Sequence, residues 1–294
     1  MNFRETLAGT GVAVVTPFKA DLTVDYKALG KLLNFLLDNG VQYIVTMGTT
    51  GETPVLSKEE KKSIIEFTYS HIAGRVPVVV GVGGNSTQDV ISDLQYFPLE
   101  QATAVLSASP YYNKPSQEGL YQHYKALAEA SAKPIILYNV PGRTGKNMTA
   151  ETTLRLAGVP NIVGIKEASG DLVQCMQILK DRPEKFLVVS GDDVLALPQM
   201  ACGMDGVISV AANCFPKQFS AMVAACRSND YALAKKINDG LLKGYDLLFA
   251  ENNPAGAKAF LNELGIIENV LRLPVVPLSS ALHDQVKLYL KSIV

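Results

Sequence analysis

The sequence predicts an α/β fold, a TIM or (β/α)8 barrel followed by a C-terminal helical extension. Eight apolar, β-branched runs recur along the chain, each followed by a turn rich in glycine or proline, and segments with helical spacing of apolar residues lie between them. The runs do not alternate apolar with polar residues, so we expect strands buried on both faces, as in parallel sheets. Strand and helix alternating eight times over roughly 210 residues is typical of such a barrel.

The expected strands share this apolar character and mostly end in a small, polar or proline residue. They are VAVVTP at 12–17, YIVTMG at 43–48, PVVVGV at 77–82, TAVLSASP at 103–110, PIILYNVP at 134–141, NIVGIK at 161–166, FLVVSGDD at 186–193 and GVISVAAN at 206–213. A doubly wound sheet is the alternative, but the first strand-to-helix turn lacks the G-x-G-x-x-G pattern of a dinucleotide site.

Helical segments are expected at 26–40, 57–72 and 118–132. The first ends in Asn39-Gly40, a common C-terminal stop, and the second opens with Ser57 and Glu60 at the spacing of a capping box. More helix follows the eighth strand, so we expect a catalytic barrel at 1–228 and a helical extension at 229–294 that packs on it.

Composition excludes several classes of protein. Of the 294 residues, 48% are hydrophobic and 19% are charged, and the formal net charge is −1, as in an ordinary soluble globular protein. Without a basic block we expect no nucleic-acid partner, and without a run of about 18 apolar residues we expect no membrane span. The N-terminus MNFRETLAGTG lacks the apolar region of a secretory signal, so a cytoplasmic protein is expected.

Cysteine and histidine give no sign of a metal site. The four cysteines form no C-x-x-C pair, and only three histidines accompany them, without zinc-like spacing. We therefore expect free thiols in a reducing compartment and no bound metal.

Reactive side chains follow several of the expected strands. In a TIM barrel, catalytic groups lie at the C-terminal ends of the strands and in the loops that follow them. The residues expected at these positions are Lys166, as the last residue of strand six, and Thr49, Thr50, Tyr111, Tyr112, Tyr138 and Arg143. Seen singly, Lys166 reads as a surface lysine, but this convergence on one end of the barrel favours a functional role.

These residue types suit carbon–carbon bond chemistry. A lysine amine in a partly apolar site forms a Schiff base with a ketone, and the iminium acts as an electron sink. A tyrosine hydroxyl on the neighbouring strand can move the proton. GTTGE at 48–52 could bind an anion or could be only a tight turn, and Arg143 could hold a carboxylate or make a surface ion pair. Tyr111 and Tyr112 could equally pack at a subunit contact.

Five motifs resemble the dihydrodipicolinate synthase family, within the wider group of pyruvate-dependent Schiff-base lyases and aldolases. They are GTTGE at 48–52, PYYNKPSQEGLYQHY at 110–124, YNVPGRTG at 138–145, GIKEASGD at 164–171 and SGDD at 190–193. The resemblance runs along essentially the whole chain. It implies condensation of pyruvate with L-aspartate 4-semialdehyde to 4-hydroxy-tetrahydrodipicolinate, on the route to diaminopimelate and lysine, with no cofactor beyond the Schiff base.

The resemblance also assigns roles to individual residues. Lys166 would form the Schiff base, and Tyr138 would relay protons together with Thr49 and with Tyr112 from the neighbouring subunit. Thr50 would hold the pyruvate carboxylate. Further substrate-binding positions are Arg143, for the carboxylate of the semialdehyde, and Gly191 and Ile208, which line the site. Because Tyr112 works across an interface, a homotetramer built as a dimer of dimers is implied.

The choice of member within the group depends on fewer residues. N-acetylneuraminate lyase and sugar-acid aldolases share the GTTGE-type turn, the tyrosine and the lysine, whereas Arg143 and the segment YYNKPSQEG favour the synthase. A barrel that has lost catalysis and serves as a binding or structural protein is the rival class. Covalent labelling by borohydride in the presence of pyruvate would separate the two classes.

Two departures from the family pattern stand out. ENNPAGAK at 251–258 lacks a proline that the family usually has, and we expect this segment to lie away from the chemistry. The second concerns a lysine-binding allosteric pocket, which the resemblance places at Asn85, Asp89, Tyr111 and Lys61. Lysine-sensitive members have a histidine at the position of Lys61, and repulsion between ammonium groups predicts weak or absent inhibition by lysine.

Overall fold

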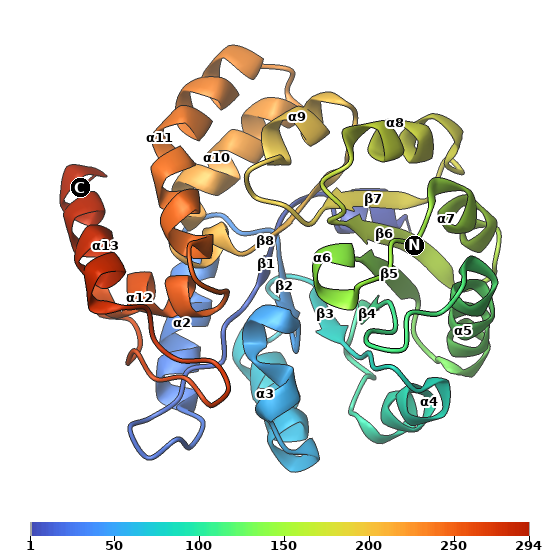
Figure 1. The fold of residues 1–294 in the computed structure, drawn as a ribbon, viewed down its shortest axis with the longest axis horizontal. Helices are drawn as coiled ribbons and strands as arrows, with labels where there is room; N and C mark the ends of the chain where they lie inside the picture. Colours follow the sequence, from blue (N-terminus) through green and yellow to red (C-terminus); the bar gives the residue numbers. More distant parts are fainter. Residues whose placement is uncertain (1, 294) are drawn as a thin grey trace.

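The structure is a computed structural model that describes residues 2–293. Eight parallel strands close into a barrel, with each strand next to those that precede and follow it in the sequence. The strands lie at the centre of the molecule with the helices around them (Figure 1). Their bounds are β1 Gly9–Ala13, β2 Tyr43–Thr46, β3 Val78–Gly81, β4 Ala104–Ala108, β5 Ile135–Asn139, β6 Ile162–Glu167, β7 Leu187–Ser190 and β8 Gly206–Ser209. The predicted (β/α)8 barrel is therefore confirmed.

The helices follow the strands in the expected alternation. The α-helices are α1 Phe3–Thr6, α2 Tyr26–Asp38, α3 Lys58–Ile72, α4 Thr87–Tyr96, α5 Gln117–Ala130, α6 Pro141–Thr144, α7 Ala150–Ala157, α8 Leu172–Asp181, α9 Ala196–Ala201, α10 Pro216–Arg227, α11 Tyr231–Phe249, α12 Ala255–Glu263 and α13 Ser280–Ile293. Short 3-10 helices are η1 Thr49–Gly51, η2 Thr53–Val55 and η3 Ala211–Asn213. The capping box is confirmed, because Ser57 Oγ accepts from Glu60 N and Glu60 Oε2 accepts from Ser57 N.

Strand ends differ from the sequence prediction in two informative places. β1 begins at Gly9, whereas the apolar run begins at Val12, because glycine is a poor signal of a strand. Gly11 is nevertheless required there, since a Cβ atom would lie 2.1 Å from a ring carbon of Tyr43 on the paired strand. β6 continues to Glu167, so the prediction that Lys166 ends the strand is wrong by one residue.

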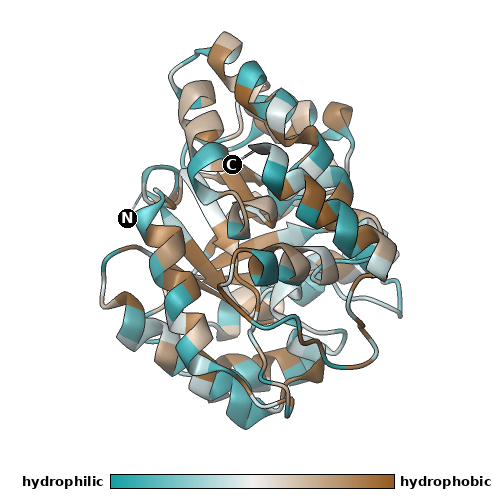
Figure 2. Cartoon of the chain, turned by 90° about the vertical axis from the view of Figure 1, so that its left-hand side faces the viewer, coloured by the Kyte–Doolittle hydropathy of each residue, from teal (hydrophilic) through white to brown (hydrophobic). Residues whose placement is uncertain are grey.

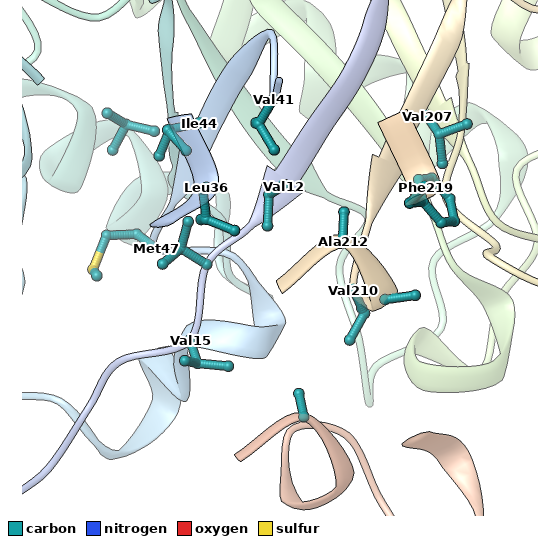
Figure 3. Close-up of a cluster of buried hydrophobic side chains, with 14 of the residues drawn as sticks. Val12, Val15, Leu36, Val41, Ile44, Met47, Val207, Val210, Ala212 and Phe219 are labelled. Carbon is teal, nitrogen blue, oxygen red and sulfur yellow. The ribbon is translucent and has the colours of Figure 1, made fainter. Parts of the chain in front are cut away.

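Two apolar layers account for the uninterrupted apolar runs. Val45 belongs to the cluster inside the barrel, whereas its neighbour Ile44 belongs to the layer between the strands and the helices. Figure 3 shows part of this outer layer, in which Val12 and Ile44 on strands lie near Leu36 of α2. Each strand is thus buried on both faces, as predicted. Figure 2 shows the matching distribution, with hydrophobic strands inside and helices that carry both hydrophilic and hydrophobic residues.

Helices α11, α12 and α13 form the helical extension predicted after the barrel (Figure 1). They pack on α10 and on the loop before it, where the ring centroids of Phe215 and Phe260 lie 5.1 Å apart. Residues of the barrel and of the extension belong to one continuous apolar cluster. Among the described residues, no helix combines the length and the apolar character that crossing a membrane requires.

Candidate active site

Lys166 and Tyr138 lie side by side at the C-terminal ends of two neighbouring strands. They are register partners in the pairing of β5 with β6, so both side chains point to the same face of the sheet, and Tyr138 packs in the cluster inside the barrel. Lys166 is 4% exposed and Tyr138 is 7% exposed. The Lys166 Nζ atom lies 4.3 Å from the centroid of the Tyr138 ring. The structure therefore brings the predicted nucleophile and the predicted proton relay together in a site with little access for water.

Gly191 directly follows β7 and Ile208 lies on β8, and these are the strands that follow β6 around the barrel. A Cβ atom on Gly191 would lie 2.8 Å from Lys166 Cε and 2.7 Å from Ala168 Cβ, so only glycine leaves room for the lysine side chain in this position. Ile208 is 1% exposed and packs in the interior cluster with Tyr138. Both predicted lining residues thus lie in the barrel interior.

The GTTGE turn is a short 3-10 helix that follows β2. Met47 and Glu52 flank it with φ of 58° and 54°, a left-handed conformation that non-glycine residues adopt rarely. Thr16 Oγ1 donates to Gly51 O at 2.7 Å and fixes the turn from the side of β1. The first N–H groups of a helix lack intrahelical acceptors, so the N–H groups of Thr49 and Thr50 are suited to bind an anion.

Asn253 contacts this turn from the C-terminal extension. Its Nδ2 atom donates to Thr50 Oγ1 at 3.0 Å, and the two side chains are 8% and 2% exposed. The prediction that ENNPAGAK lies away from the chemistry is therefore wrong. The two residues are 203 positions apart in the chain, and no local pattern in the sequence could have joined them.

A cavity of about 320 Å³ opens beside Tyr138. Of the predicted site residues, those that line it are Thr49, Tyr138, Arg143, Tyr111 and Lys61. Arg143 lies on α6, directly after β5, and is exposed. Lys166, Thr50, Gly191 and Ile208 are not among the lining residues, but Tyr138 lines the cavity and its ring lies next to Lys166. This size suits a small-molecule substrate.

Tyr112 stands apart from this group. Its side chain is 87% exposed, and its φ of 73° is left-handed, an unusual conformation for an aromatic residue. It does not line the cavity of its own chain. Its predicted action in the site of a neighbouring subunit stays a prediction.

The residues of the predicted lysine pocket are divided between the cavity and its surroundings. Lys61 and Tyr111 line the cavity, but Asn85 and Asp89 do not. Asn85 O accepts from Asn113 Nδ2 at 2.9 Å, and Asp89 lies in the first turn of α4. Within one chain the four residues do not all line this cavity, so the allosteric pocket also stays a prediction.

Two buried carboxylates near Lys166 received no role from the sequence. Asp193 accepts from Ser209 Oγ at 2.5 Å and from two backbone N–H groups of the loop after β8, and burial raises its pKa to about 6. The positive charge of Lys166 acts in the opposite direction on this pKa. Burial also raises the pKa of Glu167, which accepts from Asn139 and Ser169. Asp193 lies within the motif SGDD and Glu167 within GIKEASGD, so membership in these motifs was the one feature of the sequence that could have pointed to them.

Metal-ligating side chains do not gather in the part of the chain that the structure describes. Over residues 2–293, no group of three or more His, Cys, Asp or Glu residues could hold a metal ion. All four cysteines are free thiols.

Comparison with known proteins identifies the family. The sequence profile of the dihydrodipicolinate synthetase family matches residues 6–293. The chain belongs to this family. Its members include a 4-hydroxy-tetrahydrodipicolinate synthase from Parabacteroides distasonis, which is 51% identical over 98% of this chain and 97% of its own length. The resemblance predicted from the five motifs is thus confirmed, and the chain is an enzyme of this family.

Solved structures agree with this assignment. Dihydrodipicolinate synthase from Aquifex aeolicus is 40% identical, with a TM-score of 0.94 over 97% of this chain and 98% of that one. The chloride-inhibited enzyme from Acinetobacter baumannii, solved in complex with pyruvate, is 43% identical, with a TM-score of 0.94 over the same shares of the two chains.

Proposed function

We propose that this chain is a 4-hydroxy-tetrahydrodipicolinate synthase that condenses pyruvate with L-aspartate 4-semialdehyde through a Schiff base at Lys166. The observation that carries the proposal is the buried pair of Lys166 and Tyr138. The name borne by relatives at about half identity supports the choice of substrates. The iminium itself supplies the electron sink, so the reaction needs no further cofactor.

The first step forms the covalent intermediate. The free amine of Lys166 attacks C2 of pyruvate, and the resulting carbinolamine loses water to give an iminium. Loss of a proton from C3 then gives the enamine. Burial of the lysine favours this sequence, because the amine is poorly hydrated and the expelled water does not readily return.

Tyr138 moves the protons of these steps. Its ring lies against the lysine, so its hydroxyl can accept a proton from the attacking amine and deliver one to the departing water. Thr49 and a Tyr112 supplied by a neighbouring subunit would pass protons between this hydroxyl and solvent. Thr50 and the N–H groups of the turn hold the pyruvate carboxylate.

The second substrate enters from the cavity. Arg143 lines the cavity and binds the carboxylate of the semialdehyde in a charge-assisted pair. The nucleophilic C3 of the enamine attacks the aldehyde carbon and forms the new carbon–carbon bond. The amino group of the semialdehyde then attacks C2, displaces Lys166 and closes the ring. The enzyme would act in the cytoplasm as a homotetramer, on the route to diaminopimelate and lysine.

Product formation from the two substrates tests the proposal. We expect turnover with pyruvate and L-aspartate 4-semialdehyde, loss of that turnover in Lys166→Ala, and none with N-acetylmannosamine or glyceraldehyde as the acceptor. Turnover with a sugar acceptor instead would keep the Schiff base and reject both the substrate and the role of Arg143. An activity titration with lysine tests regulation, where half-inhibition below millimolar concentration would contradict the repulsion expected from Lys61.

A further inference from the structure

The C-terminal extension holds the GTTGE turn through several buried polar contacts. Asn253 Nδ2 donates to Thr50 Oγ1 at 3.0 Å. Lys258 Nζ is paired with Glu52 Oε1 at 2.5 Å, and the backbone N–H of Arg272 donates to Glu52 Oε2 at 3.2 Å. Both ends of the Glu52 carboxylate are therefore held by residues more than 200 positions away.

Lys258 is unusually deeply buried for a lysine. It is 0% exposed, and its Nζ atom also donates to Val270 O at 2.8 Å and lies 4.1 Å from the centroid of the Phe18 ring. Burial lowers its pKa to about 8, although the charge of Glu52 acts in the opposite direction. A buried ion pair with fixed partners on both sides is a rigid connection, and it stands at the residue where the turn takes its left-handed conformation.

The contact with Asn253 also fixes the direction of the Thr50 hydroxyl. A threonine hydroxyl has one hydrogen to donate and two lone pairs to accept. Because the amide N–H of Asn253 occupies a lone pair of Thr50 Oγ1, the hydroxyl hydrogen is left to donate to another acceptor. The turn is the segment assigned to the pyruvate carboxylate, which accepts hydrogen bonds and donates none.

We propose that Asn253 is a positioning residue, which holds the Thr50 hydroxyl as a donor to the carboxylate of the 2-oxo acid, while the Lys258–Glu52 ion pair anchors the turn. The inference rests on the proposed function, because it needs pyruvate to bind at this turn. It gives the extension a part in substrate recognition, and it makes the affinity for pyruvate depend on a residue outside the barrel.

The pyruvate dependence of borohydride trapping tests the inference without the second substrate. In Asn253→Ala we expect the half-saturating pyruvate concentration to rise roughly fivefold to tenfold, as for the loss of one ordinary hydrogen bond, with unchanged maximal labelling. Asn253→Asp keeps the size of the side chain, but its carboxylate accepts from Thr50 and repels the substrate, so a larger rise is expected. Thermal unfolding verifies that each variant folds.

Asn262→Ala is the matched control. Asn262 lies on α12 of the same extension, and its side chain donates to Ile267 O at 3.1 Å, within the extension and not to the turn. We expect this variant to keep the half-saturating pyruvate concentration of the unmodified chain. An equal rise in both variants would mean that the extension acts only through stability and would overturn the inference.

A double-mutant cycle asks whether Asn253 acts through Thr50. In a Thr50→Val background, Asn253→Ala should cause little further rise, because the hydroxyl that it orients is gone. Additive rises would reject the assigned role. The inference alone fails if the unmodified chain is labelled and both Asn253 variants keep its half-saturating pyruvate concentration. If the unmodified chain is not labelled at all, the proposed function fails together with the inference.

Discussion

Lys166 Nζ lies 4.3 Å from the centroid of the Tyr138 ring, and the two residues are register partners on β6 and β5. Register partners on neighbouring parallel strands point to the same face, so the geometry of the pair is set by the barrel itself and not by a flexible loop. The phenol ring of Tyr138 contacts the lysine and also lines the cavity, which Lys166 does not. The hydroxyl and the ring can therefore be separated experimentally.

Tyr138→Phe keeps the ring beside Lys166 and removes the hydroxyl. We expect kcat to fall by a factor of about 10² to 10⁴, the usual contribution of a positioned acid or base. Pyruvate should still be trapped by borohydride at long incubation, because the lysine is intact. Steady-state kinetics measures the effect, and a kcat within twofold of the unmodified chain would show that the hydroxyl moves no proton in the slow step.

Gly191→Ala should lower activity by displacing the Lys166 side chain, although the lysine itself is unchanged. The added methyl would meet Lys166 Cε at 2.8 Å and Ala168 Cβ at 2.7 Å, so either the lysine or the strand must shift. Overpacking of this kind costs roughly 1–3 kcal/mol of folding free energy, and we expect kcat to fall with it. Urea unfolding and steady-state kinetics measure the two effects.

Gly240→Ala is the control for that change. A Cβ atom at Gly240, within α11, would meet nothing within 4 Å, and alanine is the better helix former by about 1 kcal/mol. We expect unchanged kcat and equal or higher stability in this variant. If Gly191→Ala behaved in the same way, the tight fit around the lysine would have no role in catalysis.

Tyr112 gives a test of action between subunits. Its side chain is 87% exposed and does not line the cavity of its own chain. Tyr112→Phe and Lys166→Ala should each be nearly inactive. After the two are unfolded together and refolded as a mixture, activity should return, because a mixed dimer has one site with both an intact lysine and a tyrosine from its neighbour. No recovery in refolded, assembled protein would place Tyr112 in its own subunit's site or outside catalysis.

His123 predicts a loss of stability in mild acid. Burial between α4 and α5 lowers its pKa to about 4, below the usual 6.5, while its Nδ1 atom contacts Thr87 Oγ1 at 2.9 Å. Between pH 6.5 and 4 the imidazole of His123 is protonated in the unfolded chain but neutral in the folded chain. The contribution of the neutral, buried imidazole to the free energy of unfolding is therefore complete above pH 6.5 and is lost as the pH falls toward 4.

The loss at pH 5 should be about 2 kcal/mol relative to pH 8. In His123→Gln, which cannot be protonated, the difference in unfolding free energy between pH 8 and pH 5 should be smaller by this amount. Urea titrations of both proteins at the two pH values measure it. Equal pH dependence in the two proteins would show that His123 is protonated in the folded state.

The sequence predicts the barrel well because its signal is local. Val45 and Ile44 lie on opposite faces of one strand and are both apolar, which only a doubly covered strand explains. Lys166 and Tyr138 could be placed together for the same reason, since the ends of neighbouring strands meet. The motifs that carry the family resemblance also flank these strand ends.

Contacts between distant segments are what the sequence could not predict. Asn253 meets Thr50 across 203 residues, and its segment was expected to lie away from the chemistry. The start of β1 was missed because Gly11 is not a typical strand residue. Glycine is required there because the ring of Tyr43 on the next strand occupies the space of a side chain. Asp193 gave no sign of burial in the sequence, since its donors are the hydroxyl of Ser209 at the end of β8 and two backbone N–H groups of the loop that follows β8.

Borohydride reduction in the presence of pyruvate, followed by mass mapping of the labelled peptide, tests the central claim most directly. Lys166 and Lys258 are the buried lysines among the described residues, so each serves as a control for the other. We predict one pyruvate-derived adduct per chain, on Lys166, and no adduct in Lys166→Arg. An adduct on Lys258 or on an exposed lysine, or no pyruvate-dependent adduct at all, would contradict the account.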